Sequence, residues 1–322
     1  MRTLPAPIIA LLAAATLPCA PAHAYPPSKP AVLPPRTPAP TARSTPLVAL
    51  TLGIGAQHDS NVSIDDADLN IRQGDGALLL SAGVTLTPLA TPRTTLRFGY
   101  GHDEVRNESL TDYDLAIHAA TAGISHRFGK ITGALDYQYS HVLLGDERYL
   151  AMHMASPSLS LFATPHLFVR TAVTFVNKNF ATVDRLDADT TMVGLDAYRF
   201  FARRKGYVAL SLRADDEWTT GPEFRYGAWQ AGLRTQLPFR VLGADLRARL
   251  GYAYQRRDYG EITPSIGAPR RESRSTWTAA LDIPLGRRLT LRPQLRYVDR
   301  HSNVAIYDYR QRVVSTMLVW KP

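Results

Sequence analysis

Residues 246–254 read LRARLGYAY, so that Leu246, Leu250 and Tyr254 alternate with Arg247 and Arg249. A period of two places the apolar and the charged side chains on opposite faces of a β-strand. The same alternation returns in other parts of the chain, at residues 96–100 (LRFGY), 208–213 (VALSLR), 229–234 (WQAGLR) and 289–297 (LTLRPQLRY). No helical stripe of comparable length is present. The pattern therefore predicts an all-β chain.

The segments between the alternating stretches decide between a soluble sandwich and a membrane barrel. We predict fourteen strands, at residues 48–57, 75–87, 94–104, 112–128, 131–143, 151–163, 167–177, 187–201, 206–217, 227–238, 243–257, 274–285, 289–299 and 307–320. Longer and shorter connections alternate between them, which is typical of outer-membrane barrels. The sequence predicts a transmembrane antiparallel up-and-down β-barrel of about 14 strands, within a range of 12 to 16. An even number returns both chain ends to the periplasm.

Aromatic residues near the strand ends are expected to form the two interfacial girdles of such a barrel. This set comprises Tyr100, Tyr137, Tyr139, Phe175, Tyr198, Phe200, Trp218, Trp229, Tyr252, Tyr254, Trp277, Tyr297, Tyr307, Tyr309 and Trp320. Trp320 is also the aromatic residue that we expect the barrel-assembly machinery to recognise.

Composition divides the chain into three parts. Residues 1–24 have a positive start, an apolar core and small residues at Ala22 and Ala24, as in a secretory signal peptide. Residues 25–46 contain eight prolines and are predicted to form an extended periplasmic linker. Residues 47–322 form the predicted barrel. The only cysteine, Cys19, lies in the predicted signal peptide, which excludes disulfide and thiolate-metal chemistry from the mature chain.

The formal net charge is +9, and nearly all of the positive charge is arginine. If the apolar residues face lipid, the alternating charged residues line the lumen. The predicted lumen-lining residues are Arg97, Arg170, Arg213, Arg234, Asp245, Arg247, Arg249, Asp282, Arg292 and Arg296. They are expected to form an internal lattice of ion pairs, an electropositive route for anions, or both.

No residue pattern indicates a catalytic, metal or cofactor site. His301 and Ser302 are neighbours on a strand and therefore point to opposite faces, which argues against a base and nucleophile pair. Arg270, Arg271 and Arg274 are expected in a long loop, where they would meet the phosphates of lipopolysaccharide.

Two short segments carry a resemblance to a known family. Residues 53–62 (GIGAQHDSNV) and 301–310 (HSNVAIYDYR) resemble the first and last hairpin elements of the barrel domain in surface lipoprotein assembly modifiers. The resemblance implies a fourteen-stranded outer-membrane barrel that moves lipoproteins or other proteins to the cell surface. Members of that family typically carry tetratricopeptide repeats before the barrel, whereas residues 25–46 occupy that place here.

These observations predict a non-enzymatic barrel of the bacterial outer membrane, without a cofactor, that translocates proteins to the cell surface. The alternative is a porin-like channel with a preference for anionic solutes. The expected partners are outer-membrane lipids and lipopolysaccharide, the barrel-assembly machinery and a lipoprotein client. Nucleic acid is not an expected partner in this compartment.

Overall fold

The computed structural model describes residues 47–322 apart from 65–68, 242 and 264. The predicted signal peptide at 1–24 and the predicted linker at 25–46 lie outside the described residues. Among the residues described, no helix is long and apolar enough to cross a membrane.

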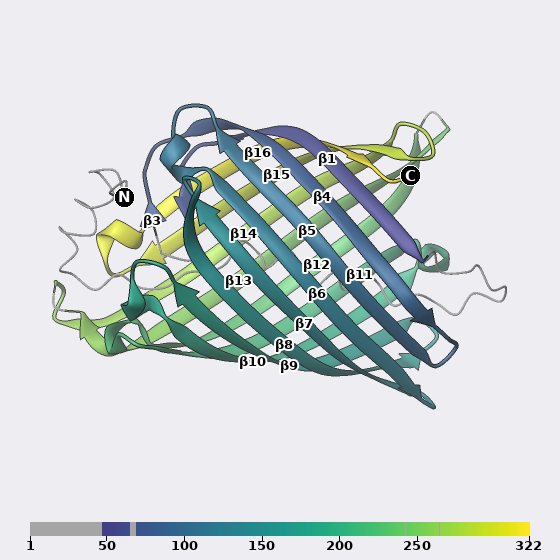
Figure 1. Cartoon of the computed structure of the whole chain (residues 1–322), viewed down its shortest axis with the longest axis horizontal. Coiled ribbons are helices and arrows are strands. Elements are labelled where there is room, and N and C mark those ends of the chain that lie inside the picture. The colour runs from purple at the N-terminus through teal and green to yellow at the C-terminus, as the bar shows by residue number, and fades with distance from the viewer. Residues whose placement is uncertain (1–46, 65–68, 242, 264) are drawn as a thin grey trace.

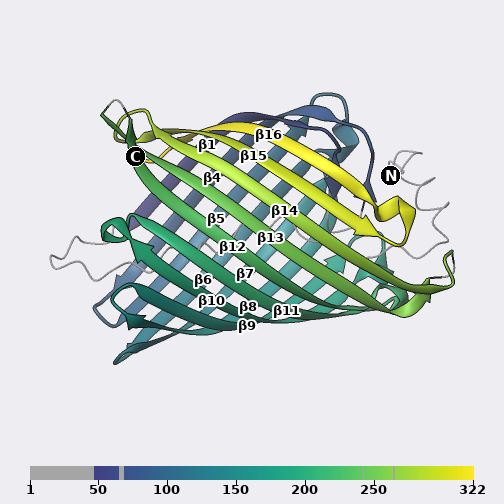
Figure 2. The same ribbon diagram turned by 180° about the vertical axis from the view of Figure 1, so that it is seen from behind.

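Fourteen antiparallel strands form a closed barrel, in which β1 pairs with both β4 and β16 (Figures 1 and 2). Their bounds are β1 (Val48–Asp59), β4 (Asp75–Ala90), β5 (Thr94–Asn107), β6 (Leu115–Phe128), β7 (Ile131–Leu144), β8 (Glu147–Thr164), β9 (Leu167–Phe180), β10 (Ala188–Phe201), β11 (Gly206–Thr219), β12 (Tyr226–Val241), β13 (Ala244–Thr263), β14 (Ala268–Pro284), β15 (Leu289–Ser302) and β16 (Tyr309–Trp320). A small hairpin, β2 (Ser63–Ile64) and β3 (Leu69–Asn70), lies in the first loop. The predicted fourteen-stranded barrel is confirmed.

The two ends of the barrel differ. The start of β1, the end of β16 and six short connections share one end, which we call the turn end (right in Figure 1, where C is marked). The opposite end, here the loop end, carries the first loop and most of the short 3-10 turns. These are η2 (Thr111–Tyr113), η3 (Asp184–Leu186), η5 (Pro222–Phe224) and η6 (Ala305–Tyr307), whereas η4 (Ala202–Arg204) lies at the turn end.

The predicted long loop over residues 258–273 was wrong, because β13 continues to Thr263 and β14 begins at Ala268. Arg270, Arg271 and Arg274 therefore lie on a strand. Arg270 is 2% exposed, since its guanidinium is paired with Glu272 and lies over the rings of Tyr259 and Tyr307. A hydrophilic segment extends as a strand here because the barrel interior supplies partners for its charges.

Two other predicted boundaries also differed. The strand predicted at 112–128 begins only at Leu115, after the 3-10 turn η2, and β8 begins at Glu147, directly after a two-residue turn. Both differences lie at the loop end, where η2 shortens β6 and the polar residues Glu147 and Arg148 extend β8 beyond its predicted start.

Exposed apolar side chains cover the outside of the barrel. Leu50, Leu159, Leu210, Leu233 and Leu295 are all exposed, and each has inward-facing neighbours on both sides along its strand. A closed barrel pairs the backbone groups of all its strands, so such a surface is suited to hydrocarbon.

The aromatic girdle prediction needs one correction. Tyr198, Phe200, Tyr307 and Tyr309 are buried inside the barrel rather than exposed at its outer surface. In β10 the sequence YRFF at 198–201 has bulky residues in both alternating sets, so the period does not select a face. The pairing of β10 with β11 decides which face Tyr198 occupies, because Tyr198 is paired with the buried Ala209 of β11.

A pair of adjacent arginine substitutions tests which face of the barrel meets lipid. We expect Leu159→Arg, on the outer face of β8, to lower the free energy of unfolding by about 2–4 kcal/mol. The control Ser158→Arg adds the same side chain to the inner face, where water and polar groups are present, and should cost clearly less. Urea titration in lipid vesicles, followed by the gel shift of the folded barrel, measures both. Equal losses would contradict the assignment of the faces.

Candidate functional site: the charged inner wall

The structure places all ten predicted lumen residues on one side of the sheet. Each is flanked along its strand by a residue of the outer set, as Arg213 is by Leu212, Arg234 by Leu233 and Arg296 by Leu295. Cross-strand pairing connects several of them in rows. For example, Arg170 is paired with Asp196, and Arg97 lies in a row with Gly123 and Asp136.

The middle of the inner wall holds loosely spaced ion pairs. Arg170 lies 3.8 Å from Asp136, and Arg213 and Arg234 each lie 3.7 Å from the same oxygen of Asp196. These distances allow electrostatic attraction but are longer than direct hydrogen bonds. The mid-barrel wall is therefore partly neutralised.

At the turn end, three arginines from the two strands beside β14 contact one carboxylate of β14. Arg292 Nε donates to Asp282 Oδ1 at 2.7 Å, Arg249 Nη2 contacts Oδ2, and Arg247 Nε lies 3.8 Å from Oδ2. Asp282 is 1% exposed, whereas the arginine side chains are between 28% and 50% exposed. The carboxylate thus fixes the arginines in place, and their guanidinium groups remain accessible to water.

Lys321, directly after β16, belongs to the same cluster. Its backbone N–H donates to the Arg288 carbonyl at 2.8 Å. Burial and the positive charges of Arg292, Arg249 and Arg247 hold the pKa of Lys321 below its usual value. We call Arg247, Arg249, Arg292, Lys321 and Asp282 the turn-end cluster. Four cations and one carboxylate give it a net charge of +3.

An aromatic wall lies beside the turn-end cluster. Phe168, Tyr198 and Phe200 pack together with the partly buried Phe162 and Tyr207. Arg234 Nη2 donates to the Tyr198 hydroxyl at 3.3 Å. The wall lies in the same cross-strand row as one of the arginines, because Tyr207 is paired with Gln236 and Gln236 is paired with Arg249. Sequence analysis missed this wall, since it placed Tyr198 and Phe200 on the outside.

A second inward acidic residue at this end, Asp245, is separate from the cluster. Asp245 lies 3.4 Å from Arg240, and both side chains are about 70% exposed. An exposed pair of this kind contributes little to stability. Asp245 is therefore a suitable control for Asp282.

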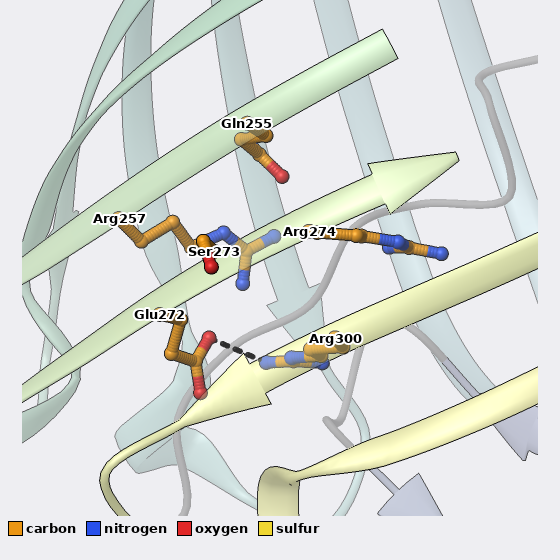
Figure 3. Close-up of a pocket in the computed structure, with 6 residues that line it drawn as sticks. All are labelled: Gln255, Arg257, Glu272, Ser273, Arg274 and Arg300. Carbon is orange, nitrogen blue, oxygen red and sulfur yellow. Dashed lines mark hydrogen bonds and ion pairs between the residues drawn. The ribbon is translucent and has the colours of Figure 1, made fainter. Parts of the chain in front are cut away.

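The loop end of the inner wall holds buried charges instead of exposed ones. One group has Glu217 at its centre, where Oε2 accepts from Lys178 Nζ at 2.8 Å, Thr190 Oγ1 at 2.9 Å and the Tyr226 hydroxyl at 3.1 Å. The other surrounds Glu272, whose Oε2 accepts from Arg300 Nη2 at 2.6 Å (Figure 3). Beside it, Gln255, Arg257, Ser273 and Arg274 complete a cavity of about 10 Å³, which has room for about one water molecule (Figure 3).

Two loops add apolar side chains to this end. Leu186 of η3 and Phe224 of η5 pack against the inward-facing Leu150, Phe180 and Tyr226. The loops are also joined to each other, since Gly221 N–H donates to the Arg185 carbonyl at 2.8 Å. The loop end is therefore packed, and the most exposed charges of the inner wall lie at the turn end.

The residues considered for catalysis do not form a catalytic pair. His301 lies 3.5 Å from Asp299 and 3.4 Å from Asp308, whereas the Ser302 hydroxyl accepts a hydrogen bond from the Val304 N–H at 3.1 Å. Within the described part of the chain, no group of three or more His, Cys, Asp or Glu residues is arranged to hold a metal ion.

Solved structures with a similar fold are outer-membrane barrels. An anion-selective porin from Comamonas acidovorans has a TM-score of 0.51 at 9% identity, over 85% of this chain and 98% of the porin. A bacterial polysaccharide outer membrane secretin has a TM-score of 0.46 at 11% identity, over 85% and 98%. CdiB from Acinetobacter baumannii has a TM-score of 0.45 at 10% identity, over 86% of this chain and 60% of CdiB.

At 9% identity, the similarity to the porin is evidence for the fold alone. The chain has the fold of outer-membrane β-barrels. No family model and no curated protein sequence matches it. The resemblance to surface lipoprotein assembly modifiers therefore stays a prediction.

The positive charge of the cluster should depend on pH through Lys321. Because its pKa is depressed, Lys321 loses its proton at a lower pH than an ordinary lysine, while the arginines stay charged. Loss of one unit charge about 8 Å from a passing anion changes its energy by about 0.5 kcal/mol in water, or roughly twofold in anion preference.

The anion preference of single barrels, measured as the reversal potential, should therefore begin to decline below pH 10.5, the ordinary pKa of lysine, and this decline should be lost in Lys321→Met. The control Lys205→Met removes an exposed lysine of the turn after η4, and should leave the decline in place. A decline of the same size in Lys321→Met would contradict the role of this residue.

Proposed function

We propose that this chain is a transport barrel of the bacterial outer membrane that takes anionic cargo at its turn end. The observation that carries the proposal is the turn-end cluster, in which Asp282 holds three arginines whose guanidinium groups remain accessible. A net charge of +3 at one mouth of a low-dielectric wall raises the local concentration of anions. The chemistry is passage and binding, without a catalytic step.

The test is ion selectivity in planar lipid bilayers. Purified barrels under a salt gradient should give a reversal potential on the anion-selective side, and polyanions should reduce the current when added at the turn end. Cation selectivity would overturn the proposal, as would the absence of any effect of polyanions on current and binding.

A second candidate function is the export of lipoproteins or other proteins to the cell surface. It is favoured by the aromatic wall next to the turn-end cluster, since an apolar wall and a basic wall together suit an amphipathic polypeptide. The resemblance of residues 53–62 and 301–310 to assembly modifiers points the same way. Deletion of the gene should then leave a particular lipoprotein inaccessible to protease on intact cells, while uptake of small anions is unchanged.

Both functions require that the turn end faces the periplasm, as short turns do in outer-membrane barrels. The only cysteine of the chain is Cys19, so single cysteines report orientation in a chain that has lost its predicted signal peptide. A cysteine at Ala305 in the last loop should react with an impermeant maleimide on intact cells. A cysteine at Gly129 in the β6–β7 turn should not react. The reverse result would contradict the proposed orientation, the barrel-assembly role of Trp320 and contact of the loop end with lipopolysaccharide.

A further inference from the structure

A cavity of about 370 Å³ opens at the rim of the loop end, at the opposite end of the barrel from the turn-end cluster. The tips of β9, β10 and β11 and the loops after β9 and β11 line it. Its residues are Asn177, Lys178, Asn179, Asp187, Ala188, Asp189, Trp218, Thr219, Thr220 and Arg225. The volume lies within the range of small-ligand sites.

Trp218 is the large apolar side chain of this cavity, and it is 59% exposed. It is the thirteenth of the fourteen residues of β11, counted from the turn end. Tyr100 and Tyr137 of the outer aromatic belt are each the seventh residue of their strands. Trp218 therefore lies near the loop-end tip of its strand, next to the loop that follows β11.

Amide and carboxylate groups stand beside the tryptophan in one cross-strand row. Trp218 is paired with Asp189, and Asp189 with Asn177. Asn177 Nδ2 donates to Asp189 Oδ1 at 2.9 Å, and Trp218 Nε1 donates to Asp216 Oδ2 at 2.7 Å. These bonds fix the side chains before a ligand arrives, which lowers the entropy cost of binding.

The second row of the cavity is also fixed by hydrogen bonds. Arg148 donates to Asn179 Oδ1 at 3.0 Å, and Asn179 Nδ2 donates to Asp187 Oδ2 at 3.2 Å. Arg225 lies over the ring of Trp218 at 5.1 Å and donates to the Thr219 carbonyl at 3.1 Å. The cavity thus combines one anchored aromatic ring with a rigid set of amide and carboxylate groups.

We propose that this cavity binds a neutral oligosaccharide. A pyranose ring has a face of C–H groups, which packs on an aromatic ring, and an edge of hydroxyl groups, which bond to amides and carboxylates. Three carboxylates, those of Asp187, Asp189 and Asp216, against Arg225 and Arg148 leave the rim with one net negative charge, because the Lys178 ammonium is bound inside to Glu217. That sign disfavours phosphorylated or carboxylated sugars.

The simpler interpretation of Trp218 is a membrane anchor like the other outer aromatics. Its place in a cavity of polar groups, which Trp229 lacks, argues against that interpretation. Two sources supply neutral sugars at the loop end, the outer core of lipopolysaccharide and free glycans of the surroundings.

Intrinsic tryptophan fluorescence of the full barrel in detergent tests the inference. The probes are dephosphorylated core oligosaccharide from lipopolysaccharide, maltoheptaose, chitohexaose and a mannohexaose, with a phosphorylated core oligosaccharide for comparison. We expect a saturable change with at least one neutral probe and at least tenfold weaker binding of the phosphorylated one. A response to the core oligosaccharide alone identifies the lipid as the source, and a response to a free glycan identifies the surroundings.

Matched variants keep the result interpretable. Trp218→Ala and the pair Asn177→Ala with Asp189→Ala should each weaken binding at least tenfold in a calorimetric titration, whereas Trp218→Phe should retain most of it. The control is Trp229→Ala, which removes an exposed outer tryptophan that does not line the cavity. The heat-modifiable gel shift shows that each variant is folded. Equal loss in Trp229→Ala, or no binding of any neutral probe, would overturn the inference.

Discussion

Replacement of Arg247, Arg249 and Arg292 by glutamine is expected to lower the ratio of anion to cation permeability several-fold. Each unit charge about 8 Å from a passing ion contributes about 0.5 kcal/mol in water, so three contribute about 1.5 kcal/mol, or roughly tenfold. Salt at 0.1 M screens over about 10 Å and reduces this to several-fold. Reversal potentials in planar bilayers measure the ratio.

The position of the charges, rather than the net charge of the protein, should determine this effect. Arg256→Gln, Arg271→Gln and Arg310→Gln remove the same charge from exposed positions on the outer face of the loop end, and should leave the ratio nearly unchanged. A triple change to lysine at the turn-end cluster should keep most of the selectivity. If the outer triple variant changes the ratio as much as the inner one, the cluster is not the selectivity site.

Asp282→Ala is expected to destabilise the barrel by about 3 kcal/mol or more, because it removes the carboxylate that neutralises three neighbouring arginines. Asp282 is almost fully buried and accepts from Arg292 at 2.7 Å. Partial hydration of the arginines places the expected loss at the lower end of the range for buried ion pairs. The free energy of unfolding is measured by urea titration of vesicle-embedded protein.

The control for this change is Asp245→Ala, at the same end of the barrel. Asp245 and Arg240 are both largely exposed, so we expect a loss of at most about 1 kcal/mol. A second variant, Asp282→Asn, keeps the shape of the side chain and isolates the contribution of its charge. A loss in Asp282→Ala as small as that in Asp245→Ala would show that the arginines do not depend on this carboxylate.

Much of the barrel was predictable because its outer and inner faces impose a local pattern. The run of alternating residues at 206–217 was placed within two residues of β11. The prediction was wrong at 258–273, where Glu272 pairs with Arg300 of β15 and Arg270 lies over the ring of Tyr259 of β13, so a polar sequence continues as sheet. It was also wrong for Tyr198 and Phe200, whose neighbours Arg199 and Phe201 leave the face undecided.

The candidate site was only partly predictable for the same reason. The alternation identifies Arg247, Arg249 and Arg292 as residues of one face, but says nothing about how far apart they lie. The register of β13 with β14 pairs Arg247 with Asp282 and brings Arg249 to the same carboxylate, and the pairing of β14 with β15 brings Arg292. Trp218 likewise belonged to the predicted girdle, and only the tips of β9 and β10 beside it show a cavity.

The sequence by itself determined that this protein is a barrel of about fourteen strands with an apolar outside and an arginine-rich inside, because a period of two is a property of neighbouring residues along one strand. Only the tertiary structure decided which charges are paired, which end keeps accessible arginines and where aromatic rings line the interior. Those contacts depend on cross-strand register and barrel closure, which join residues far apart in the chain.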